Sequence, residues 1–148
     1  MLDCIIERTN KYIDDMPKKE RKKYGQFFTS KETARFMAGL YIIPENLSKV
    51  RILDAGAGSG ILSCAILERL ERLASVQTIE LACYENDDNI LGLLRENLHT
   101  YQANSKKTFK LILSQIIILQ ASIWTSTICL VAIPSLRNMI LLLAILHI

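Results

Sequence analysis

The sequence predicts an α/β fold in which a parallel sheet is flanked by helices. Two short apolar segments, residues 50–54 and 78–84, have the composition of buried strands. Each is followed by a segment whose apolar residues recur at helical spacing. A glycine-rich turn joins the first strand directly to its helix. This β-α-β-α order with short connections implies right-handed crossovers between parallel strands.

The chain divides into two parts of different character. Its 148 residues suffice for one domain with a core of its own. Residues 1–100 carry 14 Lys and Arg against 15 Asp and Glu, whereas residues 101–148 carry four basic residues and no acidic one. We therefore assign residues 1–104 to N-terminal helices plus an incomplete α/β domain, and residues 105–148 to an atypical apolar tail.

Two helices are predicted ahead of the first strand. Residues 2–16 have approximately helical apolar spacing and are followed by Pro17, so we expect an ordinary packing helix there. A second helix begins near Ser30 or Thr29, either of which can cap it, and its apolar face continues as far as Pro44.

The cysteines and the N-terminal residues indicate a cytoplasmic protein. The four cysteines lie far apart and show no CxxC or Cys/His ligand spacing, so we expect free thiols and neither a zinc site nor a disulfide framework. The first 16 residues mix charges into every turn and lack the apolar stretch of a secretory signal.

A carboxylate and three glycines follow one another at the end of the first strand. Asp54 closes the strand, and a helix is predicted from Ile61 to about Leu73. Glycine allows a tight turn and close approach of a ligand, and the next helix offers unpaired N–H groups. The spacing Gly56, Gly58, Gly60 departs from the GxGxxG pattern of NAD and FAD sites, and no Walker lysine follows. The carboxylate suits a cationic ligand better than a pyrophosphate.

Glu85 ends the second strand, 25 residues beyond Gly60. In a doubly wound sheet this position lies beside the first loop, where an acid can accept both hydroxyls of a ribose. Alternatively, Glu85 is a solvated residue that precedes the next helix, predicted from Asp87 to His99.

Three stretches together resemble S-adenosylmethionine-dependent methyltransferases. Residues 50–62, VRILDAGAGSGIL, resemble motif I of that class, and residues 83–88, CYENDD, resemble motif II. Residues 24–30, YGQFFTS, resemble the GQ(F/Y)(F/Y)TP box that precedes motif I in adenine-N6 DNA methyltransferases of restriction-modification systems, with Ser30 in place of the proline. The resemblance covers residues 18–100 and implies a Rossmann-like methyltransferase fold that is incomplete here.

The resemblance also implies S-adenosylmethionine as the cofactor, DNA as the partner, and a role for each matching residue. The pocket would be lined by Gln26, Phe28 and Thr29; the amino acid part of the cofactor would be contacted by Asp54, Ala55, Gly56 and Gly58; its ribose would be bound by Glu85, with Asn86 near the adenine. Phe27 or Phe28 could instead be an ordinary core aromatic. The basic run at 18–23 would touch phosphates or simply form a solvated face.

No catalytic residue can be assigned from the sequence. The family holds the flipped adenine with an (N/D/S)-PP-(Y/F) loop, and this chain has no such tetrapeptide. The nearest string, residues 132–136, lacks both the polar acceptor and the aromatic ring. A separate chain that supplies the missing catalytic part is therefore one open possibility.

The tail is unlike the rest of the chain. After Lys110, 26 of 38 residues are apolar and none is acidic. We consider an out-of-frame or truncated gene first, a divergent core segment second, and a membrane span at 116–133 third; several polar residues dilute that span. An open sheet edge beside such a tail predicts poor solubility.

Two other classes of function stay open. A methyltransferase acting on protein, RNA or a small molecule would share motif I but would not need the YGQFFTS box. A non-enzymatic remnant or interaction partner would need neither substrate nor catalytic loop. A small membrane protein depends on the tail alone, and we do not favour it.

Overall fold

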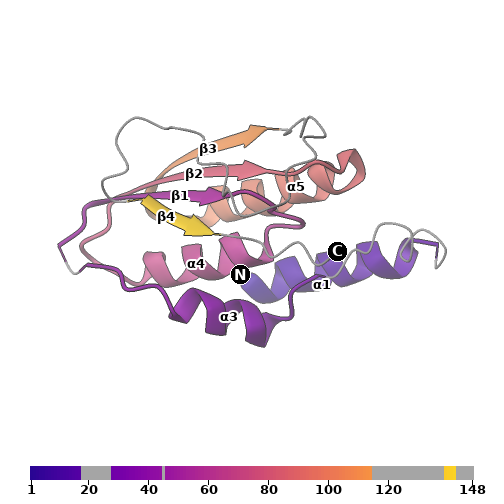
Figure 1. Ribbon diagram of the computed structural model, residues 1–148, viewed down its shortest axis with the longest axis horizontal. Coiled ribbons are helices and arrows are strands. Elements are labelled where there is room, and N and C mark those ends of the chain that lie inside the picture. Colours follow the sequence, from indigo (N-terminus) through magenta and orange to yellow (C-terminus); the bar gives the residue numbers. More distant parts are fainter. Residues whose placement is uncertain (18–27, 45, 115–138, 143–148) are drawn as a thin grey trace, which may run out of the picture.

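The computed structural model describes residues 1–17, 28–44, 46–114 and 139–142. Within these ranges four strands form one parallel sheet in the order β3-β2-β1-β4 (Figure 1). The strands are β1 (Lys49–Asp54), β2 (Thr78–Tyr84), β3 (Thr108–Ser114) and β4 (Met139–Leu142). The helices are α1 (Leu2–Asp15), α3 (Lys31–Gly39), α4 (Ile61–Glu71) and α5 (Asp88–Asn104).

The strand order reverses direction between β1 and β4. The chain moves outward from β1 through β2 to β3, and β4 then pairs with the other side of β1. Asp54 is in register with Cys83, so β1 and β2 finish at the same edge of the sheet. In open α/β sheets, ligands bind outside the carboxyl ends of the strands at such a reversal. The fold therefore places the end of β1 where a ligand site is expected.

One face of the sheet is covered by the helices. Along β1 and β2 every second side chain is buried, and these side chains are Val50, Ile52, Asp54, Ile79, Leu81 and Cys83. α4 and α5 pack on this face, with α1 and α3 beside α4 (Figure 1). The residues that alternate with these on β1 and β2 are half-exposed or exposed, and Ile112 on β3 is 47% exposed. Parallel sheets usually have both faces covered, but the described helices cover only one.

The predicted fold class and most predicted elements are confirmed. α1 ends just before Pro17, and Ser30 caps α3, its hydroxyl accepting a hydrogen bond from the Thr33 N–H at 3.2 Å. α3 ends at Gly39, so it is shorter than the apolar face predicted as far as Pro44. α5 extends beyond His99 to Asn104, because Tyr101 in its last turns is buried and donates to the Leu67 carbonyl at 3.0 Å.

The sheet continues past the predicted boundary at residues 104 and 105. β3 pairs with β2 along its whole length, and β4 pairs with β1. Half-buried side chains alternate with exposed ones from Thr108 to Leu113, so this segment has the period of a strand. This alternation is hard to recognise in the sequence because the long apolar tail follows it directly. The origin of the tail as an out-of-frame or truncated segment stays a prediction.

The membrane alternative concerned residues 116–133, which lie outside the described residues. Within the described ranges, no helix is both long and apolar enough to cross a membrane.

Candidate functional site

The loop after β1 has a backbone shape that only glycine adopts easily. Gly58 and Gly60 have φ values of +54° and +83°. A Cβ on Gly60 would also lie 2.8 Å from Cδ1 of Leu94 on α5. The Gly60 N–H donates to the Ala57 carbonyl at 2.8 Å and closes the turn. The loop is thus fixed between the end of β1, the start of α4 and the side of α5.

Asp54 is a buried carboxylate with an unpaired oxygen. Its side chain is on the helix-covered face and the residue is only 1% exposed. Oδ2 accepts a hydrogen bond from the Ser63 hydroxyl at 2.6 Å, while Oδ1 has no hydrogen-bond partner within the described residues. Burial raises the pKa of Asp54 to about 6, with a smaller contribution from the charge of Glu85, whereas the hydrogen bond from Ser63 and the nearby Gly56 backbone oppose the rise.

Glu85 joins the loop after β1 to the loop after β2. Its Oε2 accepts from the Gly58 N–H at 2.7 Å. Its Oε1 accepts from the N–H groups of Asn86 at 2.7 Å and Asp87 at 2.9 Å. All three hydrogen bonds come from backbone N–H groups, so they hold the carboxylate in one orientation. The two carboxylates therefore lie at neighbouring strand ends around the glycine loop.

Two buried polar side-chain atoms lack a partner in the part of the chain that the structure describes, and both belong to this loop region. They are Asp54 Oδ1 and Ser59 Oγ. Buried polar atoms are nearly always hydrogen-bonded in native proteins, so an exception calls for a partner such as a ligand or an ordered water. The end of β1 therefore has the features of a binding site.

Two curated proteins are similar to this chain in sequence. The type II methyltransferase M.PstI of Providencia stuartii is 34% identical over 85 residues, and the type II methyltransferase M.BsuBI of Bacillus subtilis is 34% identical over 84 residues. Type II methyltransferases are homologues of this chain. Each match covers 57% of this chain and 16% of the relative, so the chain spans less than a fifth of the length of the relatives it matches. No family model matches.

A solved structure from Listeria monocytogenes, provisionally described as a class I S-adenosylmethionine-dependent methyltransferase, has a partial likeness to this chain. The TM-score is 0.43 at 14% identity, over 66% of this chain and 32% of that one. The α/β fold class given above depends on the chain's own strand order, not on this likeness.

The structure brings together some of the residues that the sequence predicted for the site. Asp54, Gly58 and Glu85 meet at the sheet edge. Ala55 and Asn86 are exposed nearby in the chain, and Gly56 is half-exposed. Phe28 and Thr29 are half-buried ahead of α3, and Phe28 packs against the core. The remaining predicted residues lie outside the described residues, namely Gln26, Phe27 and the basic run at 18–23.

Sequence reasoning missed three polar residues that the structure places at or beside the loop. Ser63 binds Asp54, Ser59 has the unpaired hydroxyl, and Asn97 on α5 donates to the Ser59 carbonyl at 2.8 Å. All three are buried. Ser63 and Asn97 each lie within an apolar helical run, and a polar residue at a core position requires a partner; that signal could have identified them.

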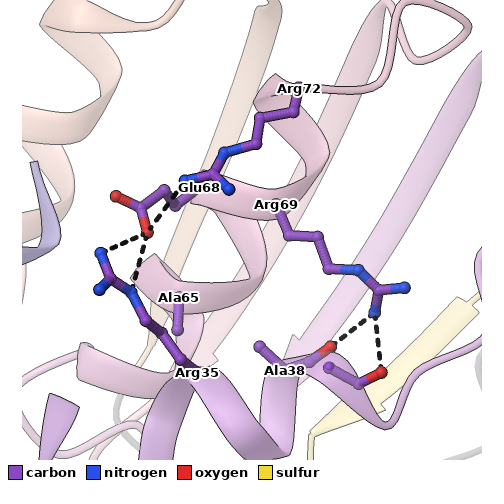
Figure 2. A pocket seen from close by; sticks show the side chains of 7 residues that line it. Arg35, Ala38, Ala65, Glu68, Arg69 and Arg72 are labelled. Atoms are coloured by element: carbon purple, nitrogen blue, oxygen red, sulfur yellow. Dashed lines mark hydrogen bonds and ion pairs between the residues drawn. The ribbon is translucent and has the colours of Figure 1, made fainter. Parts of the chain in front are cut away.

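A hollow of about 330 Å³ lies elsewhere, between α3 and α4 (Figure 2). Glu68 Oε2 pairs there with Arg35 at 3.1 Å, and Arg69 donates to the carbonyls of Ala38 and Tyr41, both at 2.6 Å. These charges hold the end of α3 against the second half of α4, so the hollow is a helix contact remote from the glycine loop.

Among the described residues, no cluster of three His, Cys, Asp or Glu side chains could hold a metal ion.

Proposed function

We propose that this chain is the S-adenosylmethionine-binding part of a site-specific DNA adenine-N6 methyltransferase of a restriction-modification system, without the catalytic loop. The observation that carries the proposal is Oδ1 of Asp54, which is buried at the end of β1 beside the glycine loop and has no partner among the described residues. The sequence relatives, which are type II methyltransferases, support the same class.

S-adenosylmethionine fits the charges of the site. The cofactor carries positive charge at its sulfonium and at its amino group, and supplies an activated methyl group when bound. A buried carboxylate without a cationic partner favours its neutral form, so a bound cation would restore the charge of Asp54 and satisfy Oδ1. Asp54, Ala55, Gly56 and Gly58 would hold the amino acid part, with Gln26, Phe28 and Thr29 lining the pocket.

Glu85 would accept a ribose hydroxyl with its remaining capacity. An ionised carboxylate has about four lone-pair sites, and three backbone N–H groups already use part of this capacity. The N–H bonds fix the carboxylate in place before any ligand arrives, so little ordering is needed on binding. Asn86, exposed beside it, would lie near the adenine ring.

The specificity for adenine in DNA is supported by the YGQFFTS box at 24–30, which resembles the box of that class. Catalytic residues stay unassigned, and a separate chain carrying the (N/D/S)-PP-(Y/F) loop would complete the enzyme. A DNA substrate would be consistent with the cytoplasmic location that the sequence predicts.

Calorimetric titration of the full chain with S-adenosylmethionine tests the cofactor site. Asp54→Asn and Glu85→Gln should each weaken binding at least tenfold, because a hydrogen bond to a charged group contributes about 1.5–3 kcal/mol. Glu80→Gln is the matched control. Glu80 is a glutamate on β2, the strand that precedes Glu85, but it pairs with Lys49 and Arg51. Its affinity should stay within twofold.

If the chain binds no S-adenosylmethionine at every pH tested, the proposal is overturned. Cofactor binding without any affinity for DNA, in a chain supplied with its complementing part, would instead favour a methyltransferase of another substrate class. Equal losses in Glu80→Gln and Asp54→Asn would show that any removed carboxylate has the same effect.

A further inference from the structure

Ser63 makes a short, fully buried contact with Asp54. It lies in the first turn of α4, three residues after Gly60, and both side chains are buried. The Ser63 Oγ to Asp54 Oδ2 distance is 2.6 Å, the length of a charge-assisted O–H···O bond. A serine at this depth needs such a partner, because an unpaired buried hydroxyl is costly.

A third group lies beside this hydrogen bond. Cys83 on β2 places its Sγ 3.6 Å from Ser63 Oγ. Burial raises the pKa of Cys83 to about 12, so its thiol is protonated and available as a weak donor to Ser63. The single hydrogen of Ser63 is donated to Asp54 Oδ2, and Oδ1 has no partner among the described residues.

We propose that Ser63 is a positioning residue that holds the Asp54 carboxylate ionised and oriented, with Oδ1 presented to the cationic part of S-adenosylmethionine. This inference rests on the proposed function. The two oxygens of the Asp54 carboxylate would therefore have different roles. Oδ2 is used to fix the group, and Oδ1 is reserved for the ligand.

The groups around Asp54 leave it as the titrating member of the cluster near pH 6. Cys83 on β2, Cys64 on α4 and Tyr41 after α3 stay neutral there, because burial raises the pKa of each. The negative charge of Glu85 also faces Asp54. The hydrogen bond from Ser63 favours the ionised form of Asp54 against both burial and Glu85.

The test is a titration of the full chain with S-adenosylmethionine at several pH values between about 5.5 and 8.5. Wild-type affinity should fall as the pH drops through about 6, where Asp54 takes up a proton. In Ser63→Ala the same fall should begin at higher pH. We expect about tenfold weaker binding than wild type near pH 6.5, since the bond lost was to a charged group, and less than twofold weaker binding near pH 8.5.

Two further variants separate positioning from packing. Ser63→Thr retains the hydroxyl and should retain the wild-type pH profile. Cys64→Ala removes the neighbouring buried side chain on α4 and should lower stability without moving the pH profile.

A uniform loss in Ser63→Ala at every pH, or a profile identical to that of wild type, would overturn the role of Ser63 while leaving the cofactor site intact. If the wild type itself binds no S-adenosylmethionine, the proposed function fails first, so the two failures are distinguishable.

Discussion

The two edges of the sheet differ in how completely their polar side chains are hydrogen-bonded within the described residues. At the carboxyl edge, Asp54 is buried with one oxygen unpaired beside the glycine loop. At the opposite edge, where α4 and α5 end, Glu71 accepts from Tyr101 at 2.9 Å, Ser105 at 3.0 Å and the Lys106 backbone at 2.7 Å. Lys107 Nζ donates there to the Leu73 carbonyl at 2.8 Å.

The contrast separates a binding edge from a structural one. A satisfied network stabilises and fixes the chain, whereas a buried polar atom without a partner costs stability until something binds it. The opposite edge therefore contributes to folding alone. At the glycine-loop edge the unpaired Asp54 oxygen lowers the free energy of unfolding of the free protein, and a ligand that binds this oxygen would remove that cost. Substitutions at the two edges should show this difference.

Gly60→Ala should have the largest effect. A non-glycine residue in the left-handed region costs about 1–2 kcal/mol, and overpacking against Leu94 adds about 1–3 kcal/mol. Denaturant unfolding should show a total loss of about 3 kcal/mol. Gly58→Ala has positive φ but open space, so it should cost about 1 kcal/mol. Gly92→Ala, inside α5 with nothing within 4 Å, should gain up to about 1 kcal/mol. Similar changes in unfolding free energy for all three variants would contradict a loop whose conformation is fixed by its glycines.

Asp54→Asn should stabilise the free protein at high pH while weakening its affinity for S-adenosylmethionine at least tenfold. The folded pKa of about 6 lies above the ordinary 3.8, so the folded state binds a proton that the unfolded chain releases. Stability is therefore lost as pH rises from about 4 to 6. The difference of about two pKa units corresponds to about 3 kcal/mol. Thermal melts should show a more stable variant at pH 8 and near-equal stabilities at pH 4. A less stable variant at pH 8 would contradict the comparison.

Glu71→Gln tests the opposite edge. Partial burial opposes ionisation of Glu71, but hydrogen bonds from Lys106, Tyr101 and Ser105 outweigh it and hold its pKa below the usual value. The variant should lose about 1–2 kcal/mol at neutral pH. Because the folded pKa is depressed, that contribution is present above the unfolded pKa and is lost as pH falls through the folded pKa, so the gap from wild type should narrow on acidification. S-adenosylmethionine affinity should not change; a tenfold change would link the edges.

The sequence predicted the elements that local patterns specify and missed those that depend on distant partners. Asp54, the glycines and Glu85 were identifiable because a strand end, a turn and a second strand end each have local signatures. Ser63 was missed because its role depends on Asp54 across the turn and Cys83 from the next strand. β3 was missed because its pairing with β2 decides its state more than its own composition does.

Arg8→Ala should have the smallest effect, and it tests how far the glycine-loop edge extends into the N-terminal helix. Arg8 on α1 donates to Asn97 Oδ1 at 2.7 Å, and Asn97 Nδ2 donates to the Ser59 carbonyl at 2.8 Å. Asn97 is fully buried, so its amide links the helix that precedes the sheet to the glycine loop. Removing Arg8 takes away its hydrogen bonds to Asn97 and Thr100 and its ion pair with the exposed Glu96. Unfolding free energy should fall by about 1 kcal/mol, and S-adenosylmethionine affinity should fall a few-fold, because the Ser59 carbonyl loses part of its support.

Glu96→Gln is the control for Arg8→Ala. Glu96 pairs with Arg8 at 3.1 Å, but its side chain is 64% exposed. An exposed ion pair contributes little, so this variant should match wild type in both measurements. If Arg8→Ala lowers stability with no change in affinity, α1 only packs against the domain, and the binding edge ends at α5. If both fall together and Glu96→Gln leaves them unchanged, the binding edge includes a residue from the first helix of the chain, far in sequence from the loop that it supports.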